Sequence, residues 1–294
     1  MTQNSTLYWA FAALVMGAIA MGISPVFVRL AEVGPFASAF WRVFLALPLL
    51  YVWSAIEIRR SDKRTSSLLK FNGPILLAGL FFAGDLIFWH LAILNTTIAN
   101  ATLLSCLAPI WVALLSGITI GEPINRRTVY GLLLCLAGAS LLIGSSFTGS
   151  SGNLIGDLYG LITSMFFGLY FLAVRVARRT ETAGKLTLKS TIITALILLC
   201  AALIAGTTFW PTSWTGVGSL LALGLVSHAG GQGLLAIALG ALSAVFASLV
   251  IFIEAIAAAI AAWLILSEQL SPIQFVGGAL ILSGVWTARP VSRG

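Results

Sequence analysis

Four ionisable side chains lie inside long apolar stretches of this sequence. Asp85, His228 and Glu254 each stand near the middle of a separate stretch, and His90 follows Asp85 on the same one. An ionisable group inside an apolar segment is costly unless it is paired or in contact with water. We therefore expect these side chains to converge on a solvated cavity that binds a ligand.

The neighbours of these groups indicate the kind of ligand. Phe81, Asp85 and Trp89 have the i, i+4 spacing that places side chains on one helix face, and His228 and Gln232 share that spacing. A carboxylate can bind an ammonium group, imidazole and amide groups can donate to a carboxylate, and aromatic rings can contact an apolar side chain. The combination fits a zwitterionic amino acid. An aromatic stripe in so apolar a chain is, however, also typical of packing or lipid-facing residues.

Four further residues complete the candidate set. Asn100 and Tyr170 add polar groups, although hydrogen bonding between helices is a simpler role for Asn100. Pro25 and Pro109 each remove a backbone donor from a predicted helix. Each proline predicts a bend that either gates the cavity or is static.

The composition indicates what kind of element must position these residues. Hydrophobic residues make up 59% of the 294 residues, and charged residues only 9%, whereas soluble domains carry about 25% charged residues. The mean hydropathy is +1.04. The length alone suggests two soluble domains, but so few charges cannot cover their surfaces. We therefore predict an all-α integral membrane protein in contact with the lipid bilayer.

The apolar stretches have the length of membrane-spanning helices. A hydrocarbon core of about 30 Å requires about 20 residues of helix, and these stretches lack the alternation of polar and apolar residues that marks barrel strands. Turn residues such as Gly34-Pro35 and Gly121-Glu122-Pro123 separate them. The ten predicted helices cover residues 8–30, 35–58, 74–95, 97–119, 127–145, 154–174, 190–207, 216–238, 242–265 and 273–288.

The basic residues orient the predicted helices. Only Arg29 and Arg42 lie near one face, so that face is expected to be extracytoplasmic and both termini cytoplasmic. Short clusters between apolar runs do not form the continuous basic face that binds nucleic acid, so we expect no such partner. The other fourteen of the sixteen basic residues are Arg59, Arg60, Lys63, Arg64, Lys70, Arg126, Arg127, Arg175, Arg178, Arg179, Lys185, Lys189, Arg289 and Arg293.

The sequence repeats itself at an offset of 146 residues without a gap. The offset aligns Gly22 with Gly168. Five predicted helices fall in residues 1–146 and five in 147–294, and an odd number inverts the second half in the membrane. Inverted repeats of this kind place a binding site near the membrane midplane, between the halves. The other aligned pairs are Val28 with Val174, Arg29 with Arg175, Gly84 with Gly230, Glu122 with Glu268, Gly131 with Gly277, and Gly138 with Gly284.

These features resemble a known family over nearly the whole chain. The five-plus-five helices, Pro109, the turn at Glu122 and its partner at Glu268, and the Gly-rich fifth and tenth helices resemble the drug/metabolite transporter superfamily, specifically its EamA-type members. The second turn departs from the pattern, because Ser267 and Gln269 replace Gly and Pro. The resemblance implies a bacterial inner-membrane exporter of amino acids and similar metabolites. It also implies a central cavity lined by helices one, three, four, six, eight and nine.

The leading hypothesis is a monomeric secondary transporter that works by alternating access. No phosphate-binding loop, redox motif or metal-ligand cluster is recognisable, so we expect no cofactor or metal. Proton coupling through Asp85, His228 and Glu254 and uniport both stay open. A nucleotide-sugar or drug carrier of the same superfamily is the alternative, but it should place several basic residues in the cavity. An intramembrane enzyme is less favoured, because no nucleophile accompanies the acidic and imidazole groups. A non-transporting receptor or scaffold is also less favoured, because it would not require charged groups at the midplane.

Overall fold

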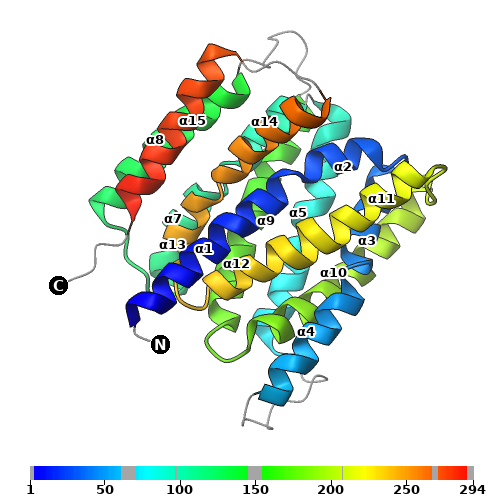
Figure 1. Ribbon diagram of the computed structural model, residues 1–294, viewed down its shortest axis with the longest axis horizontal. Coiled ribbons are helices and arrows are strands. Elements are labelled where there is room, and N and C mark those ends of the chain that lie inside the picture. The colour runs from blue at the N-terminus through cyan, green and yellow to red at the C-terminus, as the bar shows by residue number, and fades with distance from the viewer. Residues whose placement is uncertain are drawn as a thin grey trace.

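The computed structural model describes residues 3–60, 71–96, 98–144, 154–206, 208–266 and 271–289, and within them every regular element is a helix (Figure 1). In chain order the elements are α1 (Gln3–Gly22), α2 (Ser24–Leu30), α3 (Pro35–Phe44), α4 (Leu47–Arg60), α5 (Gly73–Asn95), α6 (Ile98–Ser105), α7 (Ala108–Thr119), α8 (Arg126–Gly144), α9 (Leu154–Ala177), α10 (Ala183–Ala205), α11 (Trp214–Ala222), the π-helix η1 (Leu223–Gln232), α12 (Gly233–Ala238), α13 (Ala244–Val250), α14 (Ile253–Leu266) and α15 (Pro272–Ala288).

Among the described residues, eight helical stretches are long and apolar enough to cross a membrane, and they correspond to the first four and the sixth to ninth predicted helices. The fifth and tenth predicted positions hold α8 and α15, which are helical but are not among the eight. Helix α15 has 17 residues, fewer than the about 20 that a hydrocarbon core requires. The eight stretches are Ser5–Leu30, Pro35–Arg60, Gly73–Asn95, Ala101–Thr119, Leu154–Ala177, Ala183–Ala205, Trp214–Ala238 and Ala244–Ile265.

The seventh predicted helix, which corresponds to α10, begins earlier than the sequence predicted. Helix α10 starts at Ala183 rather than near residue 190, so Lys185 and Lys189 lie in its first two turns and are buried. Lys189 Nζ lies 3.2 Å from a carboxylate oxygen of Glu181. This ion pair balances a buried charge, which is why the helix can extend through residues that the sequence assigned to a loop.

Four of the spans are interrupted within the bundle, between α1 and α2, between α3 and α4, between α6 and α7, and between α13 and α14. Helix α1 ends at Gly22 and α2 begins at Ser24, with Pro25 in its first turn. Pro109 likewise lies in the first turn of α7, just after α6 ends at Ser105. Proline lacks the backbone donor that a continuous helix needs at these positions. The break between α13 and α14 contains no proline.

Contacts 146 residues apart are equivalent. A Cβ atom added to Gly22 would lie 2.5 Å from the carbonyl oxygen of Glu254, where α1 approaches α14. A Cβ atom added to Gly168 would lie 3.0 Å from the carbonyl oxygen of Ala108, where α9 approaches α7. Gly168 and Glu254 each follow their counterpart by the offset found in the sequence. Helix α1 therefore packs on α14 as α9 packs on α7.

Helices α8 and α15 lie side by side at one edge of the bundle (Figure 1). An added Cβ atom would lie 2.6 Å from the carbonyl oxygen of Gly284 at Gly131, and 2.5 Å from that of Gly277 at Gly138. Only glycine permits so close an approach of two helix backbones. Gly131 thus contacts Gly284, the counterpart of Gly138 in the repeat, and Gly138 contacts Gly277, the counterpart of Gly131. A two-fold axis between the two helices requires this exchange of partners.

The Trp214–Ala238 span contains an irregular segment. Residues Leu223–Gln232 form the π-helix η1, which carries both His228 and Gln232. A Cβ atom added to Gly231 would lie 2.5 Å from Cγ of Met21, so η1 packs tightly on α1. A π-helical segment widens the helix and changes the direction of its side chains, and such segments are frequent at functional sites.

The visible helix ends are arranged as an even number of crossings requires. The start of α1, the end of α4 and the end of α15 lie toward the same end of the bundle (Figure 1).

Several charged residues named in the sequence analysis fall outside the described residues. They are Lys63, Arg64, Lys70, Glu268 and Arg293.

Candidate functional site

A pocket opens in the bundle where the interrupted spans meet. Its lining comes from α1, α2, α5, α6, α7, α9, η1, α13 and α14, the segments that the resemblance implied, and α3 adds one residue. The lining residues are Met21, Ser24, Pro25, Arg42, Phe82, Asp85, Leu86, Trp89, Thr102, Ser105, Cys106, Ala108, Pro109, Phe167, Phe171, Gln232, Ser248, Ile251, Phe252, Glu254, Ala255 and Ala258.

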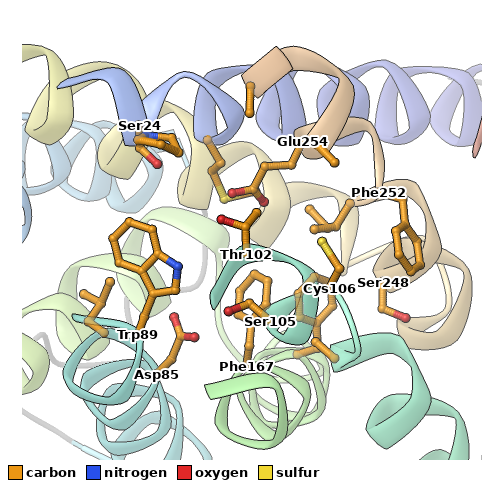
Figure 2. Close-up of a pocket in the computed structure, with 18 of the residues that line it drawn as sticks. Ser24, Asp85, Trp89, Thr102, Ser105, Cys106, Phe167, Ser248, Phe252 and Glu254 are labelled. Atoms are coloured by element: carbon orange, nitrogen blue, oxygen red, sulfur yellow. The ribbon is translucent and has the colours of Figure 1, made fainter. Parts of the chain in front are cut away.

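Two carboxylates from separate helices line this pocket. Asp85 lies on α5 and Glu254 at the start of α14. Figure 2 shows the two side chains on different sides of the pocket, with Thr102 and Ser105 of α6 nearby. Asp85 is only 9% exposed. Neither carboxylate makes an ion pair within 4.0 Å with a residue in the described part of the chain. Two acidic groups are therefore available to a cationic ligand.

A basic residue also lines the pocket, although the sequence placed it near the extracytoplasmic face. Arg42 lies within the Pro35–Arg60 span and is 7% exposed. Counting basic residues could not reveal this, because Arg42 lies only two turns after the start of α3 and so resembles an interface residue. The pocket therefore combines one cationic and two acidic side chains.

Aromatic rings form much of the remaining wall. Phe82 and Trp89 come from α5, and Phe167 and Phe171 come from α9. The centroids of the Phe167 and Phe171 rings are 5.1 Å apart in an edge-to-face arrangement, which is favourable for aromatic pairs. Figure 2 shows the Trp89 indole beside Asp85, on the same side of the pocket. The wall can therefore contact an apolar or aromatic group near the acidic groups.

The amide of Gln232 lines the pocket and is held in place from behind. Tyr170 Oη donates a hydrogen bond of 3.0 Å to Gln232 Oε1. Gln232 Nε2 lies 3.2 Å from Sδ of Met21, a weak acceptor. Tyr170 itself is 3% exposed and lies outside the pocket lining. Its hydroxyl therefore fixes the orientation of the Gln232 amide.

The two histidines lie outside the pocket lining. His90 is 1% exposed, and its Nδ1 donates to the carbonyl oxygen of Leu86 at 2.6 Å. The Nε2 atom of His228 lies 2.9 Å from Oγ1 of Thr191, and the His228 ring packs against Phe82 at 5.4 Å between centroids. Both imidazole rings therefore lie behind the pocket surface, where they contact other residues of the bundle.

The Phe81 side chain packs between helices instead of lining the pocket. Its ring packs on Phe166 of α9 with 6.2 Å between centroids, and Phe81 is not part of the lining. Pro25 and Pro109 do line the pocket, at the helix breaks. Asn100 lies in α6, but its side chain is outside the described residues.

The described residues offer no group of three or more His, Cys, Asp or Glu side chains that could hold a metal ion. The three cysteines are not joined to each other: Cys106 lines the pocket, Cys135 is buried between α8 and α15, and Cys200 is exposed.

The described part of the chain is helical in all its regular elements, and it holds eight membrane-length apolar helices and a pocket with charged side chains; such a chain is a multi-pass membrane protein. Comparison with known proteins narrows this class. The model of the EamA-like transporter family matches residues 8–144 and again 154–288. The chain therefore belongs to the EamA-like transporter family.

Individual relatives agree with this assignment. An uncharacterized transporter of Archaeoglobus fulgidus is 26% identical over 94% of this chain and 95% of its own length. The pseudopaline exporter CntI of Pseudomonas aeruginosa is 30% identical over 71% of this chain and 72% of its own length. These relatives are named as transporters rather than enzymes. A solved crystal structure with 18% identity covers 99% of both chains with a TM-score of 0.81, which shows the fold.

Proposed function

We propose that this protein is a secondary transporter that exports aromatic and other neutral amino acids, and similar small metabolites, across the inner membrane. The observation that carries the proposal is the placement of Asp85 and Glu254, two carboxylates without an ion-pair partner among the described residues, in a pocket walled by aromatic rings. A relative named as a pseudopaline exporter supports export of a small metabolite.

Alternating access is the proposed mechanism. Residues 1–146 and 147–294 form the two inverted halves, and α8 and α15 complete a set of ten membrane helices. The equivalent contacts at Gly22 and Gly168, and the crossed contacts between α8 and α15, support this arrangement. Rocking of one half against the other would expose the pocket to one side of the membrane and then to the other.

The orientation follows from the distribution of charge. Both termini are assigned to the cytoplasm, because fourteen of the sixteen basic residues fall on the predicted cytoplasmic side in the sequence. The even number of crossings agrees with the helix ends in Figure 1. The proposed working unit is a monomer, because one chain supplies both inverted halves.

Flux of labelled amino acids into vesicles containing the purified protein tests the proposal. The panel is Trp, Phe, Thr, Met and uridine-nucleotide sugars. Asp85→Asn and Glu254→Gln should each reduce amino-acid flux about tenfold or more, because a charge-assisted hydrogen bond contributes about 1.5–3 kcal/mol. Glu57→Gln is the control, because Glu57 bonds the backbone N–H of Gly184 outside the pocket.

Two results would contradict the proposal. Wild-type flux in both carboxylate variants would remove the pocket from the transport path. Transport of the nucleotide sugars without any amino acid would assign the protein to the alternative carrier class.

A further inference from the structure

Arg42 is a buried cation with an unused hydrogen-bonding group. Its side chain lines the pocket, and the residue is 7% exposed. Its Nε atom is buried without a hydrogen-bond partner among the described residues. No carboxylate in the described part of the chain lies within the 4.0 Å of an ion pair with it. A guanidinium in a pocket with an unsatisfied donor is therefore poised to bind an anion.

The charges around Arg42 are balanced at longer range. Asp85 on α5 and Glu254 on α14 both interact electrostatically with its guanidinium. Burial of an unpaired arginine is costly, and the two carboxylates offset part of that cost. They do not satisfy its hydrogen-bond donors, because no hydrogen bond joins either carboxylate to Arg42 among the described residues. The remaining donors are available to a ligand.

Guanidinium geometry favours one kind of anion. The planar group presents parallel N–H donors that match the two oxygens of a carboxylate. The same pocket presents carboxylates that match an ammonium group. Both kinds of side chain line the same pocket as the aromatic rings of Trp89 and Phe167. The three features together match a molecule that carries a carboxylate, an ammonium group and an apolar side chain.

We propose that Arg42 is the residue that binds the carboxylate of the transported molecule, while Asp85 and Glu254 bind its ammonium group. The inference rests on the proposed transport of amino acids and narrows its substrate class to zwitterions. Amines without a carboxylate and carboxylates without an amine then bind poorly, because each leaves one buried charge of the pocket without a partner.

Competition against labelled L-phenylalanine in protein-containing vesicles tests this assignment. The competitors are unlabelled L-phenylalanine, L-phenylalaninamide, which lacks the carboxylate charge, and 3-phenylpropanoate, which lacks the amine. In the wild type only L-phenylalanine should compete, with an advantage of about tenfold or more over either analogue. Arg42→Gln should remove this preference over the amide, and Arg42→Lys should retain part of it. Arg60→Gln, at the exposed end of α4, should behave as the wild type.

The controls separate a binding role from a structural one. If Arg42 only balanced the charge of the buried carboxylates, Arg42→Gln would weaken the binding of L-phenylalanine and of its amide to the same degree. That result would overturn the assignment. If Arg42→Gln does not fold, as judged by its melting profile, the wild type and Arg42→Lys still decide the matter. Equal competition by L-phenylalanine and its amide in both proteins would overturn it.

Failure of the assignment is distinct from failure of the proposed function. Wild-type vesicles that transport L-phenylalanine without discriminating the amide would leave the transporter proposal intact and overturn the role of Arg42. Wild-type vesicles that transport no amino acid would overturn both.

Discussion

Arg175 of α9 and Glu122, just after α7, form an ion pair between segments that are far apart in the sequence. Nε of Arg175, near the end of α9, donates a hydrogen bond of 2.7 Å to Oε1 of Glu122, which lies just after α7. The other carboxylate oxygen of Glu122 accepts a hydrogen bond of 2.7 Å from the backbone N–H of Ala244, the first residue of α13. One carboxylate therefore joins three spans at the same end of the bundle.

Removal of this carboxylate should loosen that end. We expect Glu122→Gln to lower the free energy of unfolding by about 1–3 kcal/mol, because it leaves the partly buried Arg175 and the Ala244 N–H with a weaker acceptor. The melting temperature of the purified protein in detergent measures the effect.

Arg126→Gln is the matched control. Arg126 lies only four residues from Glu122 in the sequence, but Arg126 is exposed and Glu122 pairs with Arg175 instead. The control should leave the melting temperature unchanged. A larger loss in Arg126→Gln than in Glu122→Gln would contradict the pairing.

The importance of Glu122 could be predicted from the sequence, but its partner could not. The repeat identified Glu122 as a special position, because it aligned with another glutamate at a single offset along with several glycines. The partner could not be found, because nearness in sequence favours Arg126 whereas the turn after α7 carries Glu122 toward α9. Gly121, with φ of 73°, forms part of that turn. Side-chain partners across helices depend on such turns, which composition and periodicity do not determine.

The glycines of α8 and α15 give a second stability prediction. We expect Gly138→Ala to destabilise the protein by about 1–3 kcal/mol, because the new Cβ atom would lie 2.5 Å from the carbonyl oxygen of Gly277 and the two backbones would have to separate. Gly278→Ala has the neighbouring position in α15 but meets no atom within 4 Å. It should leave the melting temperature unchanged or raise it. Equal effects of the two substitutions would argue against close packing of α8 on α15.

Glu32 gives a prediction for the dependence of stability on pH. It is an exposed residue between α2 and α3 with a positive φ of 58°, and its carboxylate accepts hydrogen bonds from Thr212 and Ser213. The Ser213 and Thr212 hydroxyl groups, and then their backbone N–H groups, hold the pKa of Glu32 below its ordinary value of 4.5. The carboxylate therefore stabilises the link between the α2–α3 turn and the start of α11.

The sign of the effect follows from the lowered pKa. A carboxyl group with a lower pKa in the folded state contributes stability above its unfolded pKa and loses it as the pH falls through the folded pKa. The wild type should melt at a higher temperature than Glu32→Gln at pH 7, and the difference should shrink below pH 4.5. Thr212→Val, which removes one of the hydroxyl donors, should give a smaller difference from the wild type. A difference between wild type and Glu32→Gln that does not change with pH would contradict this role.

Only some residues of the candidate site could be predicted from the sequence. Asp85 and Glu254 were identifiable, because a carboxylate in the middle of an apolar span requires a reason to be there. His90 and His228 met the same criterion, yet Leu86 and Thr191 occupy ring nitrogens behind the pocket. Only the folded neighbours distinguish the two cases. Arg42 was missed because a cation near the start of a span is usually an interface residue.

Trp89 should determine the preference for aromatic substrates, if the pocket transports amino acids as proposed. Its indole forms part of the wall beside Asp85 (Figure 2), so Trp89→Ala removes apolar surface that a bound aromatic side chain would cover. We expect flux of L-phenylalanine and L-tryptophan to fall about tenfold relative to wild type, and flux of L-threonine to change less, because a smaller side chain buries less area against the wall. Trp214→Ala is the control, since Trp214 is 86% exposed at the start of α11. Equal losses for threonine and the aromatic amino acids in Trp89→Ala would indicate that the indole supports the pocket as a whole. A change confined to the aromatic amino acids would show that the indole contacts the substrate side chain.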